Sequence, residues 1–176
     1  NKKVCNHLHI PLQAGSDEIL KRMNRKYDLA YYEEKINKIR SIRPDISITT
    51  DIIVGFPYET DELFNETLEF SKKMNFSKIH VFPYSIRVGT AASLMPSQVD
   101  EATKKVRVKK LMALSEKQEK EYYEKFKGKE LDILVEECDN NVSIGHTSNY
   151  LMVTLNENLL VGKIYKRILW ITLKAS

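Results

Sequence analysis

The sequence predicts an α/β protein in which part of a parallel sheet is followed by a long helix and a small antiparallel β-barrel. Strand and helix patterns alternate over residues 1–97, and such alternation requires crossover helices between parallel strands. From residue 128 onward, short alternating stretches separated by polar turns are typical of a small barrel. A polar stretch over 98–127 predicts a connecting helix. We therefore expect three parts: 1–97, 98–127 and 128–176.

The composition suits a globular protein of one or two domains, because 42% of the 176 residues are hydrophobic. The formal charge of +4 is too small to indicate a nucleic-acid partner by itself. No apolar run has the length of a membrane span, and the sequence does not open on a secretory signal. The two cysteines, Cys5 and Cys138, lack the spacing of a metal site, and such sparse cysteines favour a reducing, cytoplasmic compartment.

The first strand is expected over residues 3–10 and ends at Pro11. Ser16 suits the N-cap of a short helix, with Asp17 and Glu18 in its first turn. A second helix is expected from about Ala30 to Ile42, because apolar residues recur there at helical spacing. These elements lead into the central strand.

The central strand and the turn after it form the first candidate site. A β-branched run ending at Val54 predicts a strand buried on both faces. Gly55 then permits a tight turn and close approach of a ligand, and Pro57 ends the strand. Thr60 is expected to cap the next helix, which extends to about Met74. Ligands of α/β proteins bind at such carboxyl ends of strands.

A third strand over residues 77–84 is followed by a loop that contains Arg87. The guanidinium of Arg87 suits a carboxylate or phosphate, and a surface salt bridge is an equally good interpretation. In a parallel sheet, the loops near Gln13, Gly55 and Arg87 would lie along one rim. The alternation fits either an open sheet or part of a barrel.

The helix predicted over 98–127 concentrates positive charge: residues 98–129 contain ten Lys or Arg and six Asp or Glu residues. A sparse apolar seam is expected at Val106, Leu111, Leu114 and Tyr122. Taken alone, this pattern favours a solvated connector between domains. In the barrel that follows, Lys163, Lys166 and Arg167 lie in a stretch without acids and predict a modest RNA-binding side.

The residues alone do not define a reaction. His7 and His9 have a spacing that suits a metal on one strand face, but no third ligand is nearby, so no metal site is predicted. No Ser/His/Asp arrangement, Walker loop or cysteine cluster is present in the sequence. These observations therefore predict a ligand-binding rim and an appended barrel.

Several motifs in order nevertheless resemble the methylthiotransferase family of radical S-adenosylmethionine (SAM) enzymes. The matching stretches are 9–16 (HIPLQAGS), 23–27 (MNRKY), 50–57 (TDIIVGFP) with Glu59 and Thr60, and Tyr84–Ser85 with Arg87, Gly89 and Thr90. Residues 128–174 resemble the TRAM domain that ends such enzymes. Residues 79–85 and 95–99 are most similar to the branch that acts on threonylcarbamoyladenosine in tRNA.

The resemblance implies a TIM-like radical SAM barrel half, a connecting helix and a TRAM barrel that binds tRNA. It also implies that SAM and two [4Fe-4S] clusters insert a methylthio group at carbon 2 of a modified adenosine next to the anticodon. The family's cluster cysteines match no position of this sequence, so the chain is expected to be inactive alone. An exposed edge at the first strand would permit self-association.

By the same resemblance, Gln13, Ser16, Ile53, Gly55 and Tyr84 are expected to contact SAM. Substrate contacts are expected from a second group, which consists of Arg25, Asp51, Arg87, Lys163, Lys166 and Arg167. The sequence departs from the family pattern where Ala14 replaces a serine, Tyr58 a glycine and Ile86 a proline.

Alternative functions remain open at this point. The substrate is isopentenyladenosine in tRNA, or a ribosomal protein, in other branches of the family. The chain also fits a tRNA-binding module without chemistry of its own, built on the basic helix and the barrel. An unrelated α/β ligand-binding protein is a third interpretation.

Overall fold

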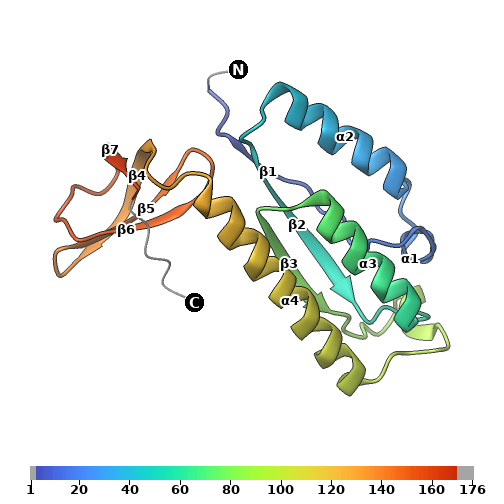
Figure 1. The fold of residues 1–176 in the computed structure, drawn as a ribbon. Coiled ribbons are helices and arrows are strands. Elements are labelled where there is room, and N and C mark those ends of the chain that lie inside the picture. The colour runs from blue at the N-terminus through green and yellow to red at the C-terminus, as the bar shows by residue number, and fades with distance from the viewer. Residues whose placement is uncertain (1–2, 170–176) are drawn as a thin grey trace. The chain divides into compact units, whose positions relative to one another are not determined.

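The structure, a computed structural model, describes residues 3–169 (Figure 1). The chain forms two compact units. The sheet unit comprises His9–Pro44 and Ile48–Glu119. The C-terminal unit comprises the start of the chain up to Leu8, Asp45–Ser47 and the chain from Lys120 onward. The boundary therefore falls inside the long helix, whereas the sequence predicted boundaries at its ends.

The parallel sheet has the order β1-β2-β3, with β1 at His7–His9, β2 at Ser47–Val54 and β3 at Lys78–Pro83. Strands β2 and β3 run parallel, with a register from Thr49 opposite Lys78 to Val54 opposite Pro83. The predicted parallel sheet is thus confirmed. Strand β1 is much shorter than the predicted 3–10.

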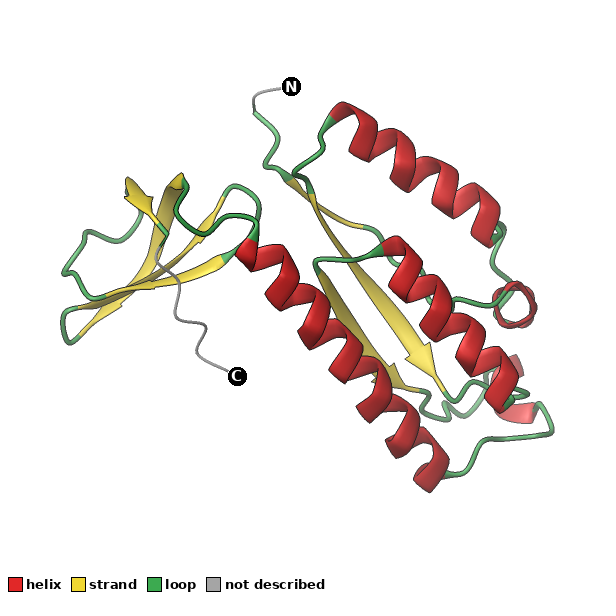
Figure 2. Ribbon diagram, viewed as in Figure 1, coloured by secondary structure: helices red, strands yellow, loops and turns green. Residues whose placement is uncertain are grey.

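Helices connect these strands, as Figure 2 shows. They are α1 (Asp17–Arg22), α2 (Leu29–Ile42), α3 (Asp61–Met74), the 3-10 helix η1 (Ala91–Leu94) and α4 (Glu101–Glu124). Thr60 caps α3 as predicted, because its side chain accepts the N–H of Leu63 at 3.3 Å. Ser16 occupies the N-cap position of α1 as predicted, with Asp17 and Glu18 in the first turn, but its side chain makes no capping hydrogen bond.

The two faces of β2 differ. Ile48, Ile52 and Val54 are fully or almost fully buried, and each such side chain stabilises the fold by about 1.5–3 kcal/mol. Asp51 and Ile53 on the opposite face are only partly buried. Ser47 and Thr49 on that same face are buried, so the predicted burial on both faces holds for the first half of β2 and fails from Asp51 onward.

Helix α4 packs into the sheet unit through a mixed polar and apolar stripe. At helical spacing it buries Lys104, Arg107, Leu111, Ser115 and Gln118. Val106, predicted to lie in the apolar seam, is 54% exposed. The Ser115 hydroxyl accepts the N–H of Ile79 at 2.9 Å and lies 3.2 Å from its carbonyl oxygen, so it occupies part of the β3 edge.

The C-terminal unit contains an antiparallel sheet of order β6-β5-β4-β7. Its strands are β4 (Glu130–Asp139), β5 (Val142–Thr147), β6 (Met152–Leu155) and β7 (Ile164–Ile168). Asn140 and Asn141, with φ of 47° and 63°, form the β4–β5 turn, where asparagine tolerates the left-handed conformation. Within residues 3–169 the strands form an open sheet, and closure into the predicted barrel is not seen.

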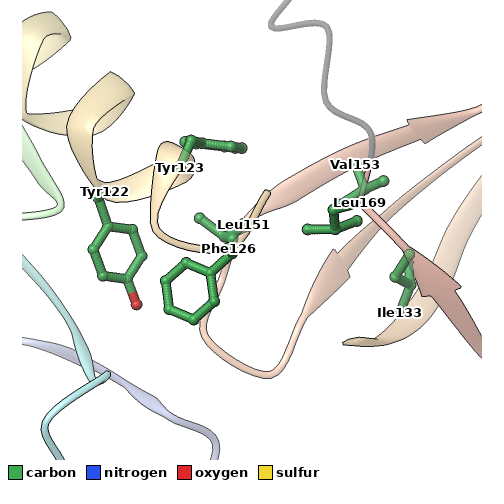
Figure 3. Packing of buried hydrophobic residues seen from close by; sticks show 7 residues of the cluster. All are labelled: Tyr122, Tyr123, Phe126, Ile133, Leu151, Val153 and Leu169. Carbon is green, nitrogen blue, oxygen red and sulfur yellow. The ribbon is translucent and has the colours of Figure 1, made fainter. Parts of the chain in front are cut away.

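Aromatic residues at the end of α4 supply much of the core of this unit. The cluster consists of Tyr122, Tyr123, Phe126, Ile133, Leu151, Val153 and Leu169 (Figure 3). The Tyr122 hydroxyl donates to the carbonyl of Asp45 at 2.8 Å, and the Asn149 amide donates to Tyr122 at 3.2 Å. No helix within the described residues is both long and apolar enough for a membrane span.

Candidate functional site

The ends of the parallel strands meet along one rim. The N–H of Gln13 donates to the carbonyl of Asp51 at 2.8 Å, and the N–H of Ile53 donates to the carbonyl of Gln13 at 2.9 Å. The N–H of Tyr84 donates to the carbonyl of Val54 at 2.8 Å. Because Gly55 directly follows Val54, Gln13, Gly55 and Tyr84 lie close together at the carboxyl end of the sheet.

Among the polar atoms at this rim that are buried without a partner in the described part of the chain are the Ser16 Oγ and the Tyr84 hydroxyl. The Tyr84 ring packs edge-on against Phe56 with 5.2 Å between ring centroids. An unsatisfied buried polar group costs about 1–3 kcal/mol, so such groups indicate a missing water or ligand. This rim therefore fits a polar cofactor.

Gly55 also leaves room for a side chain of α4, which the sequence did not predict. Gly55 has a φ of 75°, and a Cβ atom there would overlap Cγ of Lys104. Lys104 is only 2% exposed and its ammonium donates to Glu101 at 2.8 Å. The absent side chain of Gly55 therefore leaves room for Lys104 of α4, whereas the sequence predicted room for a ligand.

Glu59 is the buried centre of an ionic network. Its Oε2 accepts the N–H of Gly55 at 2.6 Å and Nη1 of Arg107 at 2.9 Å. Arg107 also donates to Asp61 at 2.8 Å. Burial raises the pKa of Glu59, and the Gly55 N–H and Arg107 oppose that shift. The Arg107 hydrogen bond lowers the pKa of Asp61. The network fixes the Gly55 turn to α4.

Asp51 faces the less covered side of the sheet. Its Oδ2 lies 3.2 Å from Nε2 of His9, and Nδ1 of His9 lies 2.9 Å from the Thr49 hydroxyl. The His80 ring lies 5.7 Å from that of His9. His7, in the C-terminal unit, stacks on Tyr150 at 4.5 Å. Across residues 3–169 no three His, Cys, Asp or Glu side chains are grouped to hold a metal.

The other predicted substrate residues are dispersed. Arg25 and Arg87 are exposed, and neither forms an ion pair with a described residue. Arg167 donates to both carboxylate oxygens of Glu157, so its charge is largely neutralised. Lys163 and Lys166 are exposed. Successive strand residues face opposite sides, so Lys166 and Arg167 do not form one basic surface.

Comparison with known proteins shows which family the sequence resembles. Residues 1–71 match the Radical SAM superfamily model. The threonylcarbamoyladenosine tRNA methylthiotransferase MtaB of Bacillus subtilis is 45% identical over 93% of this chain and 38% of that protein. The tRNA-2-methylthio-N(6)-dimethylallyladenosine synthase of Thermoanaerobacter sp. is 46% identical over 92% of this chain and 35% of that protein. The chain thus spans little more than a third of these curated relatives.

A solved structure shares the fold. Coproporphyrinogen III oxidase (HemN) from Escherichia coli, described as a radical SAM enzyme, has a TM-score of 0.53 at 24% identity, over 64% of this chain and 27% of HemN. The match over residues 1–71, together with the curated relatives, places the sequence in the radical SAM class. Within that class, the identities of 42–48% to named tRNA methylthiotransferases show that the chain belongs to the methylthiotransferase family.

Proposed function

We propose that this chain is part of a tRNA methylthiotransferase that modifies carbon 2 of threonylcarbamoyladenosine next to the anticodon. The main support is the rim, where Gln13, Gly55 and Tyr84 converge beside two buried polar atoms without partners. The similarity to MtaB supports the reaction and the substrate. The tRNA substrate favours action in the cytoplasm.

SAM is the cofactor that this rim would bind. We assign its contacts to Gln13, Ser16, Ile53, Gly55 and Tyr84. The Ser16 and Tyr84 hydroxyls offer hydrogen bonds that no described residue uses. When bound, SAM supplies the radical chemistry and the methyl group of the family's reaction. The role of the protein rim is to hold and orient the nucleoside end of this cofactor, away from water.

The described residues do not fit an iron–sulfur cluster, which requires several convergent thiolates. The sequence has two cysteines, Cys5 and Cys138, and Cys138 donates to Asn158 at 3.3 Å. We therefore propose that the ligands of both [4Fe-4S] clusters belong to other segments of a longer protein, and that this chain is inactive alone.

Contacts with tRNA are proposed for Arg25, Asp51, Arg87, Lys163 and Lys166, with Arg167 contributing less because Glu157 already binds it. Self-association through the β1 edge is a further proposal, which sedimentation of the chain would test.

A second substrate is favoured by a specific observation. The dimethylallyladenosine synthases are 42–46% identical to this chain, almost as similar as the MtaB proteins at 44–48%. If the protein modifies no adenosine in tRNA, the remaining interpretation is a tRNA-binding module without catalytic activity.

Nucleoside analysis of tRNA would test these proposals. The full-length parent protein is expressed in a host that lacks its own methylthiotransferases. We expect the methylthio derivative of threonylcarbamoyladenosine, and expect its loss when Ser16→Ala and Tyr84→Phe are combined. The dimethylallyl derivative in its place would instead support the second substrate, and neither product would contradict both.

A further inference from the structure

Tyr58 occupies a strained position in the loop after β2. Its φ of 68° lies in the left-handed region, where a bulky residue is an outlier. Gln13 and Ser97, also at this rim, have φ of 74° and 57°. The N–H of Tyr58 donates to the carbonyl of Ser97 at 3.0 Å. Such strain concentrates at functional sites, so the Tyr58 side chain is a candidate for a direct role.

Arg22 orders the Tyr58 ring. The guanidinium carbon lies 4.1 Å from the ring centroid, a favourable cation–π distance. Glu18 accepts from Nη2 of Arg22 at 2.6 Å and from Nε at 3.2 Å, which anchors the guanidinium. The Arg22 side chain is 34% exposed, so the pair lies at the surface of the sheet unit.

The segment that carries Arg22 is basic. Lys21, Arg25 and Lys26 are all exposed. Two nearby acids bind backbone N–H groups at the start of α2. Asp17 accepts the N–H of Leu29 and Asp28 accepts that of Tyr31, each at 2.8 Å, so both carboxylates cap this helix. An ordered aromatic ring beside such cations is the combination that binds RNA, because bases stack on the ring and phosphates approach the cations.

We propose that Tyr58 is a stacking surface for a nucleobase of the RNA substrate, with Arg22 as the residue that positions its ring. This inference rests on the proposed function and assigns a substrate contact at the same rim. A stacked base adds affinity without adding charge, so its contribution is independent of salt, whereas phosphate contacts weaken as salt rises.

Binding of a tRNA anticodon stem–loop would test this role. The 176-residue chain is titrated into a fluorescein-labelled stem–loop that carries threonylcarbamoyladenosine, over a potassium chloride series. Tyr58→Asn removes the ring and retains a residue that tolerates the left-handed backbone. We expect at least about fivefold weaker binding at every salt concentration, with an unchanged salt slope. Tyr58→Phe keeps the ring and is expected to bind like the unsubstituted chain.

Tyr31 provides a matched control. It is an exposed tyrosine on α2, with the Lys35 ammonium 4.5 Å from its ring centroid. Tyr31→Asn should leave binding unchanged, and urea midpoints of all variants would establish that they are folded. A second measurement needs no variant: photo-crosslinking to a stem–loop with 5-iodouridine in the loop should modify Tyr58.

The outcomes separate the inference from the function. Unchanged binding by Tyr58→Asn, or cross-links that avoid Tyr58, would overturn the stacking role alone. An equal loss in Tyr31→Asn, or a changed salt slope in Tyr58→Asn, would also overturn it. If the unsubstituted chain does not bind the stem–loop even at low salt, the proposed RNA partner of this chain is contradicted as well.

Discussion

The interior of the sheet unit next to the rim differs in chemistry from the core of the C-terminal unit. Near the rim, α4 buries Lys104 and Arg107 against the Gly55 turn and Glu59. In the C-terminal unit, Tyr122 in the last turn of α4 and Phe126 just after the helix belong to an aromatic and aliphatic cluster. One helix thus serves two kinds of interior. Buried ionic contacts contribute little net stability but fix geometry, whereas apolar packing mainly stabilises.

Removal of Arg107 should have the largest effect. Arg107→Ala leaves Glu59 buried without its cation, and such changes cost about 3–5 kcal/mol of unfolding free energy. Urea denaturation would measure the loss, and hydrogen exchange should show it at the Gly55 turn. The double variant Arg107→Ala with Glu59→Gln should recover part of the stability. No recovery would show that the ion pair does not explain the effect.

A substitution in the apolar core of the C-terminal unit should cost a similar unfolding free energy, but the loss of protection should appear in that unit. Phe126→Ala removes a side chain that is 4% exposed, and we expect a cost of about 3–5 kcal/mol. Hydrogen exchange should increase in β4–β6 and leave β2 protected. Val106→Ala on the exposed side of α4 is the control, with an expected change within about 0.5 kcal/mol. Equal effects of both variants would remove the distinction between the two interiors.

Ser115 tests the edge of the parallel sheet. Ser115→Ala removes the hydroxyl beside the N–H and carbonyl of Ile79, and we expect a loss of about 1–3 kcal/mol. Ser115→Thr keeps the hydroxyl and serves as the control. If sedimentation also shows concentration-dependent association of the alanine variant, Ser115 protects the β3 edge from pairing. Unchanged stability would show that water replaces the hydroxyl.

The smallest expected effect is the pH dependence of the Glu157–Arg167 pair. The Arg167 hydrogen bond lowers the pKa of Glu157 below its value in the unfolded chain. The pair therefore stabilises the fold above the unfolded pKa, and this contribution is lost as pH falls through the folded pKa. Because the pair is exposed, Glu157→Gln should reduce the acid sensitivity of C-terminal unit unfolding only slightly. A variant with a steeper acid transition would contradict this sign.

Sequence reasoning was most successful where local chemistry decides. The strand ending at Val54 and the cap at Thr60 follow from β-branching and capping preferences. Along α4 it correctly placed Leu111 and Tyr122 in the seam but missed the other buried positions at 104, 107, 115 and 118, because these are polar and resemble a solvated face. The helical spacing of Lys104, Arg107 and Leu111 was the available signal.

The order of the elements, the parallel sheet and the position of the rim at its carboxyl end could all be predicted from the residues, since these depend on periodicity and chain direction. Three contacts emerged from the folded chain alone: Lys104 fills the space beside Gly55, Glu59 binds Arg107, and Arg22 stacks on Tyr58. The physical reason is that a charged side chain carries no mark of burial in the sequence. Its partner, often distant along the chain, decides whether it remains in water.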